Sequence, residues 1–230
     1  MKTTSFDNDN RPEGEVLLID KPVDYTSAHV VNIVKKAFDV KKAGHSGTLD
    51  PKASGLLIIC TGKKTKMLSE MLITDKEYEG IIELGSVTKS FDSETEVHER
   101  KPFSHVTMND LESASKKFTG EIEQVPPMYS AIKYKGKPLY KYARKNKEIE
   151  RKPRKIFISR FEITKMNLPD VYFRIRCSKG TYIRSIANDF GETLGTGGYL
   201  KELRRTKIGD YDVVNALKLD EIISKIKNND

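Results

Sequence analysis

Several features that mark specialised classes of protein are scarce in this chain. Its two cysteines, Cys60 and Cys177, each lie in an apolar or strand-like pattern, so neither a disulfide framework nor a zinc site is expected. The four histidines show no metal-ligand spacing. No apolar run approaches the roughly 20 residues of a membrane span, and the polar amino terminus lacks the apolar core of a signal peptide. We expect a cytoplasmic protein without metal or membrane contact, with residues 1–13 as a flexible arm.

Acidic residues are outnumbered. Lysine and arginine total 41 against 33 acids, giving a net charge of +8 and a pI near 9.2, which favours a polyanionic partner. The excess is concentrated in residues 124–155, which contain eleven cations and two acids. Four tyrosines lie among these cations: Tyr129, Tyr134, Tyr140 and Tyr142. Their rings could stack on bases while the cations contact phosphates, which favours loop RNA. The alternative is a solvated basic loop.

The apolar pattern predicts interspersed strands and helices. An apolar content of 37% with 8% aromatics is that of an ordinary globular protein. We predict an α+β (mixed α/β) domain built around a twisted sheet. The predicted strands cover residues 14–20, 55–60, 77–84, 156–163 and 171–180. The predicted helices cover residues 26–38, a segment through Leu68 and Leu72, residues 107–118 with a capping box, and residues 181–195.

The stretch HSGTLDPKASG, residues 45–55, places an acid before a proline in a loop of small residues. Glycines in the loop permit backbone angles that other residues resist, and Pro51 pushes Asp50 toward an extended conformation. Such a loop can hold one carboxylate toward a ligand, although an aspartate before proline is most often a turn residue. On residue types alone, His45 and Asp50 could serve a hydrolase as acid and base. No nucleophile motif supports that alternative.

Two further residues stand out by their positions in the predicted elements. Alternation along residues 77–84 turns Tyr78 inward together with Ile82 and Leu84. Arg184 lies near the amino-terminal end of the last predicted helix, away from its apolar stripe. Taken singly, Tyr78 would be a core residue and Arg184 a solvated helix residue.

Four long stretches resemble the bacterial TruB family of tRNA pseudouridine synthases, in order, from about residue 14 to residue 210. They are LLIDKPVDYTS, GHSGTLDPKASGLLIICTGKKTK, VPPMYSAIKYKGKPLYKYAR and CSKGTYIRSIANDFGETLGTGGYLKELRRTKIG. The resemblance implies a pseudouridine synthase catalytic domain over residues 14–230, with a mixed or antiparallel sheet flanked by helices. It also implies that residues 124–155 grip the T-loop, and we expect no C-terminal PUA domain. The implied enzyme is an isomerase that converts uridine 55 of tRNA to pseudouridine without cofactor or metal.

The resemblance also implies roles for individual residues. Asp50 corresponds to the catalytic aspartate, Tyr78 to the tyrosine that stacks on the target base, and Arg184 to the arginine that pairs with the catalytic carboxylate. The residues implied to bind substrate or support the catalytic loop are His45, Tyr182, Leu203 and Lys21. Within the basic insertion, the lysines expected to contact RNA are Lys133, Lys135 and Lys141. We expect a monomer that binds the T-arm of tRNA without an obligate protein partner.

The chemistry is compatible with these roles but leaves alternatives open. Isomerisation breaks the bond between uracil N1 and ribose C1′ and rejoins the base through C5. A carboxylate could begin this at C1′, by helping to form a glycal, or at C6 of the base. A guide-dependent, dyskerin-type synthase would share Asp50, and a catalytically silent tRNA-binding or RNA-folding module would explain the basic insertion. The silent module has no need for Asp50, Tyr78 and Arg184 together.

Overall fold

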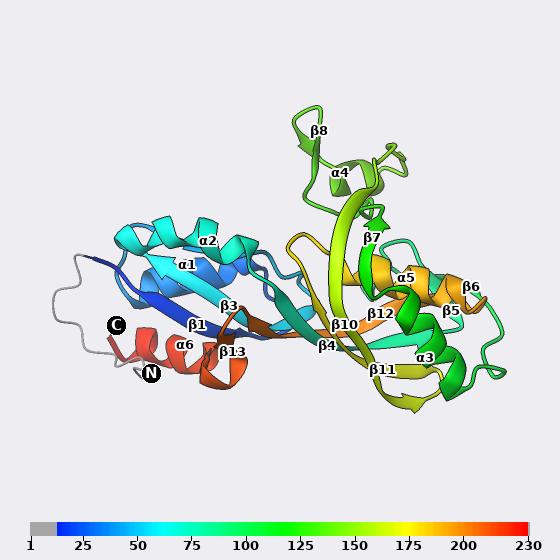
Figure 1. The fold of residues 1–230 in the computed structure, drawn as a ribbon. Helices are drawn as coiled ribbons and strands as arrows, with labels where there is room; N and C mark the ends of the chain where they lie inside the picture. Colours follow the sequence, from blue (N-terminus) through cyan, green and yellow to red (C-terminus); the bar gives the residue numbers. More distant parts are fainter. Residues whose placement is uncertain (1–12, 230) are drawn as a thin grey trace. The chain divides into compact units, whose positions relative to one another are not determined.

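The computed structural model describes residues 13–229, and the chain divides into two compact units (Figure 1). The first unit comprises the described residues up to Tyr78 and those from Leu203 onward, and the second comprises Glu79–Glu202. The chain passes between the units within β4 (Lys76–Leu84) and within β12 (Gly198–Ile208). The predicted amino-terminal arm lies outside the described residues except for Glu13.

The first unit is built on a mixed sheet with the strand order β14-β1-β3-β12, in which β2 pairs with β3 and β13 with β12. β1 runs antiparallel to β3, whereas β12 runs parallel to it. The strands are β1 (Val16–Lys21), β2 (Ala43–His45), β3 (Ala53–Thr61), β13 (Tyr211–Asp212) and β14 (Leu217–Lys218). The helices are α1 (Ser27–Ala37), η1 (Gly62–Met67), α2 (Leu68–Ile73), η2 (Val213–Asn215) and α6 (Leu219–Asn229).

Strand β3 is buried on both faces, which accounts for its unbroken apolar run. Leu57 and Ile59 join one hydrophobic cluster with side chains from β1, α1 and α6. Leu56 and Ile58 join a second cluster with Met71 of α2. The predicted strand at residues 55–60 and the predicted helix at residues 26–38 are therefore confirmed, the latter with its amino-terminal cap at Thr26.

The second unit has the strand order β4-β11-β10-β7, with β10 antiparallel to both β11 and β7. Its other strands are β5 (Ser86–Thr88), β6 (Val97–Arg100), β7 (Gly120–Gln124), β8 (Lys133–Tyr134), β9 (Lys137–Pro138), β10 (Arg154–Asn167) and β11 (Asp170–Cys177). Its helices are α3 (Met108–Lys117), α4 (Tyr140–Ala143) and α5 (Ile183–Thr193). The strands and helices predicted for this region are confirmed, including the capping box of α3.

Four phenylalanines join the helices to the sheet in the second unit. Phe118 follows α3, Phe190 belongs to α5, and Phe161 and Phe173 lie on β10 and β11; neighbouring ring centroids are 5.4–6.2 Å apart. This core fixes α5 against the strands. The segment with β8 and α4 extends beyond the ends of β7 and β10 (Figure 1). It corresponds to the basic insertion predicted over residues 124–155.

Candidate active site

The loop that contains Asp50 joins β2 to β3, and its backbone is fixed on both sides of the aspartate. Gly47 has φ = 128°, a value that residues with a Cβ rarely adopt. The Ser27 hydroxyl, in the first turn of α1, accepts from the Leu49 amide at 2.9 Å and donates to the Leu49 carbonyl at 3.1 Å. The Pro51 carbonyl accepts a backbone N–H at 2.7 Å. Asp50 itself is half-buried, so its carboxylate is held on an ordered loop just before β3.

Lys21 ends β1 with a fully buried side chain. Its ammonium donates to the carbonyls of Pro22 and Tyr25, both at 2.8 Å, and to that of Pro51 at 3.3 Å. Burial lowers the pKa of Lys21 to about 8, against the opposing effect of the Asp50 carboxylate. At pH 7 the ammonium is therefore charged and tethers the loop at the residue after Asp50.

Arg205, on β12, is a second buried cation beneath the same loop, and the sequence analysis did not identify it. Its Nε donates to the Leu56 carbonyl at 2.8 Å and its Nη2 donates to the Gly47 carbonyl at 3.1 Å. The two contacts connect Gly47, near the start of the loop, to Leu56 on β3, the strand that follows the loop. No local signal marks Arg205 in the sequence, because alternation along β12 places it on the same face as Lys201 and Lys207.

His45 ends β2 and is half-buried. Its Nδ1 accepts from the backbone amide of Gly47 at 3.3 Å, which places the ring proton on Nε2 in the neutral form. Burial, followed by the positive charge of Arg205, lowers the pKa of His45. The imidazole is thus neutral at pH 7 and bonded to the loop that contains Asp50.

Tyr78 and Leu203 also belong to the first unit. Tyr78 is 8% exposed on β4, so the inward orientation predicted from alternation is confirmed. Leu203, on β12, is paired in register with Ala53, the first residue of β3. The first unit therefore holds five of the expected site residues: Lys21, His45, Asp50, Tyr78 and Leu203. Arg184, Tyr182 and the three lysines of the insertion belong to the second unit.

Arg184 lies in the first turn of α5 with 4% of its surface exposed, so it is not the solvated residue that its sequence position alone suggested. Its Nη1 is 3.2 Å from the Oδ2 atom of Asp92, which is 5% exposed. The second carboxylate oxygen of Asp92 accepts from the Glu94 amide at 2.9 Å. A buried guanidinium is thus held by a buried carboxylate that is itself oriented by the backbone. Nothing local in the sequence marks Asp92, because its contact with Arg184 spans 92 positions.

Tyr182 occupies the amino-terminal cap position of α5, two residues before Arg184. The Gln124 side chain bonds to both backbone polar groups of Tyr182, and the guanidinium of Arg154 lies over the tyrosine ring, 4.7 Å from its centroid. Neither Gln124 nor Arg154 was singled out from the sequence.

The insertion presents its cations to solvent. Lys133 and Lys135 lie on or beside the β8–β9 hairpin and Lys141 lies on α4, and all three are exposed. The rings of Tyr134 and Tyr142 pack edge to face at 5.9 Å between centroids. The insertion therefore combines exposed ammonium groups with an aromatic pair formed between the hairpin and α4.

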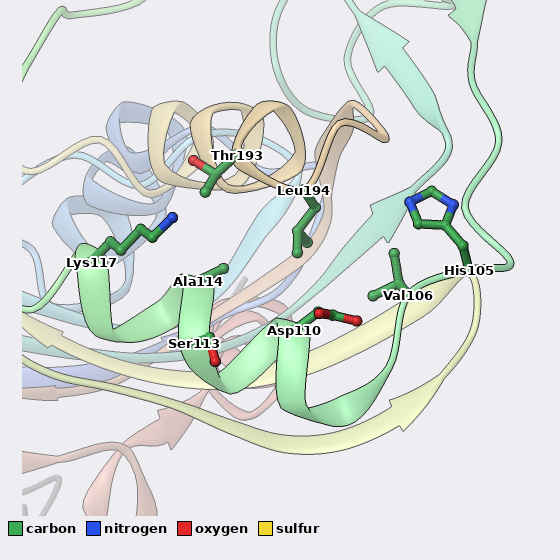
Figure 2. Close-up of a pocket in the computed structure, with 8 residues that line it drawn as sticks. All are labelled: His105, Val106, Asp110, Ser113, Ala114, Lys117, Thr193 and Leu194. Atoms are coloured by element: carbon green, nitrogen blue, oxygen red, sulfur yellow. The ribbon is translucent and has the colours of Figure 1, made fainter.

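A pocket of about 270 Å³ lies elsewhere on the second unit, between α3 and the end of α5 (Figure 2). Its lining includes His105, Asp110, Lys117 and Thr193, and none of the expected site residues. Thr193 is nine residues along α5 from Arg184, or about 14 Å of helix. Across residues 13–229, no group of three or more His, Cys, Asp or Glu side chains is placed to hold a metal ion. No described helix has the length and apolarity to cross a membrane.

Two family models together match residues 35–230. Residues 35–183 match the TruB family pseudouridylate synthase N-terminal domain, and residues 184–230 match the tRNA pseudouridylate synthase B C-terminal domain. The chain belongs to the TruB family. The division at residue 184 falls in the first turn of α5, and the TruB N-terminal match includes the Asp50 loop, Asp92 and the basic insertion.

Curated relatives in this family match almost the whole chain. A protein of Chloroherpeton thalassium named tRNA pseudouridine synthase B is 50% identical over 220 residues, covering 94% of this chain and 91% of the relative. One of the same name from Flavobacterium johnsoniae is 50% identical over 214 residues, covering 90% of this chain and 93% of the relative.

Solved structures confirm the predicted fold class. A chain from a Cbf5–Nop10–Gar1 complex matches with a TM-score of 0.71 and 30% identity, over 93% of this chain and 54% of its own. A chain from an H/ACA RNP bound to a substrate RNA containing 2′-deoxyuridine gives a TM-score of 0.69 at 28% identity, over 93% and 53%. This chain spans about half the length of those solved chains.

Proposed function

We propose that this protein isomerises uridine 55, in the T-loop of tRNA, to pseudouridine. The observation that supports it most is the mounting of Asp50 on a loop tethered by two buried cations, Lys21 and Arg205. This chain is also 50% identical to proteins named tRNA pseudouridine synthase B, over about nine-tenths of their length. An ordered loop around one carboxylate fits a reaction that needs one nucleophile at a defined position.

In the proposed reaction, the Asp50 carboxylate stabilises or attacks the nucleoside while the bond between N1 and C1′ breaks. The uracil turns, C5 bonds to C1′, and the proton lost from C5 is balanced by one gained at N1. Only an ionised carboxylate is an effective nucleophile, and a nearby positive charge favours ionisation. We assign that charge to Arg184, whose guanidinium is held by the buried carboxylate of Asp92.

The target uridine lies in a folded RNA loop, so the enzyme must extrude it at a cost of a few kcal/mol. Stacking on an aromatic ring contributes about 1–3 kcal/mol per base and offsets much of that cost. We assign this platform to Tyr78. The exposed cations of the insertion supply contacts to phosphates of the T-arm, and its tyrosines, of which Tyr134 is exposed, supply contacts to bases.

Two of the rival functions, the guide-dependent synthase and the silent tRNA-binding module, can be weighed against the comparisons and the site. The chain is about 50% identical to proteins named for tRNA, against 30% or less for solved chains from the Cbf5 and H/ACA complexes reported above. This favours an enzyme that acts directly on tRNA over a guide-dependent one. A silent tRNA-binding module would account for the insertion but not for a buried ion pair at the start of α5.

The proposal is tested by incubating the purified protein with an unmodified tRNA transcript and mapping pseudouridine by carbodiimide adducts and primer extension. We expect one new stop, at the T-loop uridine. A transcript with cytidine at that position is the matched control and should give no stop. Tight binding of tRNA without any stop would refute the enzyme and favour the silent module.

A further inference from the structure

The two ends of the basic insertion meet at the turn before α5. At the first end, Gln124 is 1% exposed, and its side chain forms two hydrogen bonds with the backbone of Tyr182. Its Nε2 donates to the Tyr182 carbonyl at 3.0 Å, and its Oε1 accepts from the Tyr182 amide at 2.8 Å. A side-chain amide satisfied in both directions fixes the backbone of that residue firmly. The next carbonyl, of Val125, accepts from the buried hydroxyl of Ser185 at 3.3 Å.

At the second end, Arg154 begins β10 and holds the same turn from its side chain. Its guanidinium lies over the Tyr182 ring, 4.7 Å from the centroid, and also donates to the Gly180 carbonyl. A planar guanidinium can stack on a ring and bond in its own plane at once, which an ammonium cannot do. Gln124 therefore holds Tyr182 through its backbone, and Arg154 holds it through its ring.

We propose that Gln124 and Arg154 are positioning residues that hold the Tyr182 ring and the first turn of α5 for catalysis. Because they are also the two roots of the insertion, RNA bound by the insertion acts on Tyr182 and, two residues further, on Arg184. The inference rests on the proposed function. It assigns neither residue a contact with the reacting atoms; both act through Tyr182.

The first test separates positioning from RNA affinity. Arg154→Ala and Gln124→Ala are compared with wild type under single-turnover conditions at saturating tRNA, and tRNA Kd is measured separately. We expect Arg154→Ala to slow the saturating rate about five-fold, in line with one lost cation–π contact, with a smaller change in Kd. Arg154→Lys should recover part of the rate. The matched control is Arg160→Ala, which removes an arginine of the same strand paired with Glu162, and should leave the saturating rate unchanged.

A double-mutant cycle then asks whether Arg154 acts through the tyrosine ring. In a Tyr182→Ala background, Arg154→Ala should have a smaller effect, because it then removes only the contact with the Gly180 carbonyl, whereas in a Tyr182→Phe background it should keep its full effect. Equal slowing in both backgrounds would overturn the assignment. So would a wild-type saturating rate for Arg154→Ala.

A fluorescence measurement tests the Tyr182 clamp, formed by Gln124 and Arg154, and does not depend on catalytic activity. The chain contains no tryptophan, so Tyr182→Trp introduces a single tryptophan at the turn, whose fluorescence can be excited separately from that of the tyrosines. Adding Gln124→Ala or Arg154→Ala should increase acrylamide quenching about two-fold, and adding Arg160→Ala should not. Unchanged quenching in folded variants would refute the clamp. A wild-type protein that forms no pseudouridine would instead refute the proposed function, and the quenching result would still decide whether Tyr182 is held.

Discussion

Replacing Arg205 with lysine should loosen the loop that contains Asp50 while keeping the buried positive charge. The guanidinium bonds the Leu56 and Gly47 carbonyls at 2.8 and 3.1 Å, and a compact ammonium can reach only one of them. A charge-assisted hydrogen bond lost at a buried carbonyl costs about 1.5–3 kcal/mol. For a chain of this length that lowers Tm by roughly 3–12 °C. Displacing reacting groups by about 1 Å can cost about 100-fold, so we expect a 10- to 100-fold slower single-turnover rate.

The neighbouring Arg204→Lys is the control. Arg204 bonds Asp20 through two contacts of 2.9 and 2.6 Å, and its side chain is 41% exposed. This pair joins β12 to β1 and not to the Asp50 loop, so the rate should stay near wild type. Differential scanning calorimetry and single-turnover assays on both variants compare the two positions. Similar small effects from both would refute a special role for Arg205 in holding the loop.

The charge of Arg205 gives the same position a second readout. The guanidinium is one of the causes that lower the pKa of His45, after burial. Arg205→Met should therefore raise the pKa of His45, measured by NMR titration of its ring protons. An unchanged titration in a folded variant would show that the two side chains do not interact electrostatically.

Three other predictions concern charge around the site. Asp92→Asn keeps the shape of the partner of Arg184 but removes its charge, and should slow the saturating rate at least about ten-fold. A wild-type rate would show that the charge of Asp92 has no role in holding Arg184 for the reaction. Because Lys21 has a pKa of about 8, its tether is charged below that pH and neutral above it, so the rate should fall as pH rises through 8. The Lys21→Arg profile should stay flat between pH 7 and 9, and an identical fall in both proteins would assign the titration to another group. Charge reversal of three exposed lysines in the insertion, Lys133, Lys135 and Lys141, should weaken tRNA binding and flatten its salt dependence. Filter binding at several salt concentrations measures both effects. An unchanged salt slope would show that the insertion does not contact the tRNA.

The elements that the sequence predicted are those with local signals. The unbroken apolar run of β3 follows from burial on both faces, and the capping box of α3 is formed by residues three positions apart. Alternation along β4 correctly turned Tyr78 inward. In each case a periodicity or a short-range hydrogen bond is enough to specify the local structure.

The residues that the sequence analysis missed depend on contacts between distant positions. Arg205 reaches Gly47 across 158 positions, Arg184 pairs with Asp92, and Gln124 bonds Tyr182 across 58. A buried arginine or glutamine has no periodicity of its own, because its burial is stabilised by one carbonyl or carboxylate elsewhere in the chain. Family resemblance named the residues proposed to act on the base but not the buried partners that hold them.

The most direct test of the central claim is Asp50→Asn in the tRNA mapping assay, with tRNA affinity measured on the same preparation. The amide is isosteric but cannot act as a carboxylate nucleophile, so we expect the stop at the T-loop uridine to disappear while Kd stays within about three-fold of wild type. Substantial pseudouridine formation by Asp50→Asn would contradict the account, because the chemistry would then belong to a different residue.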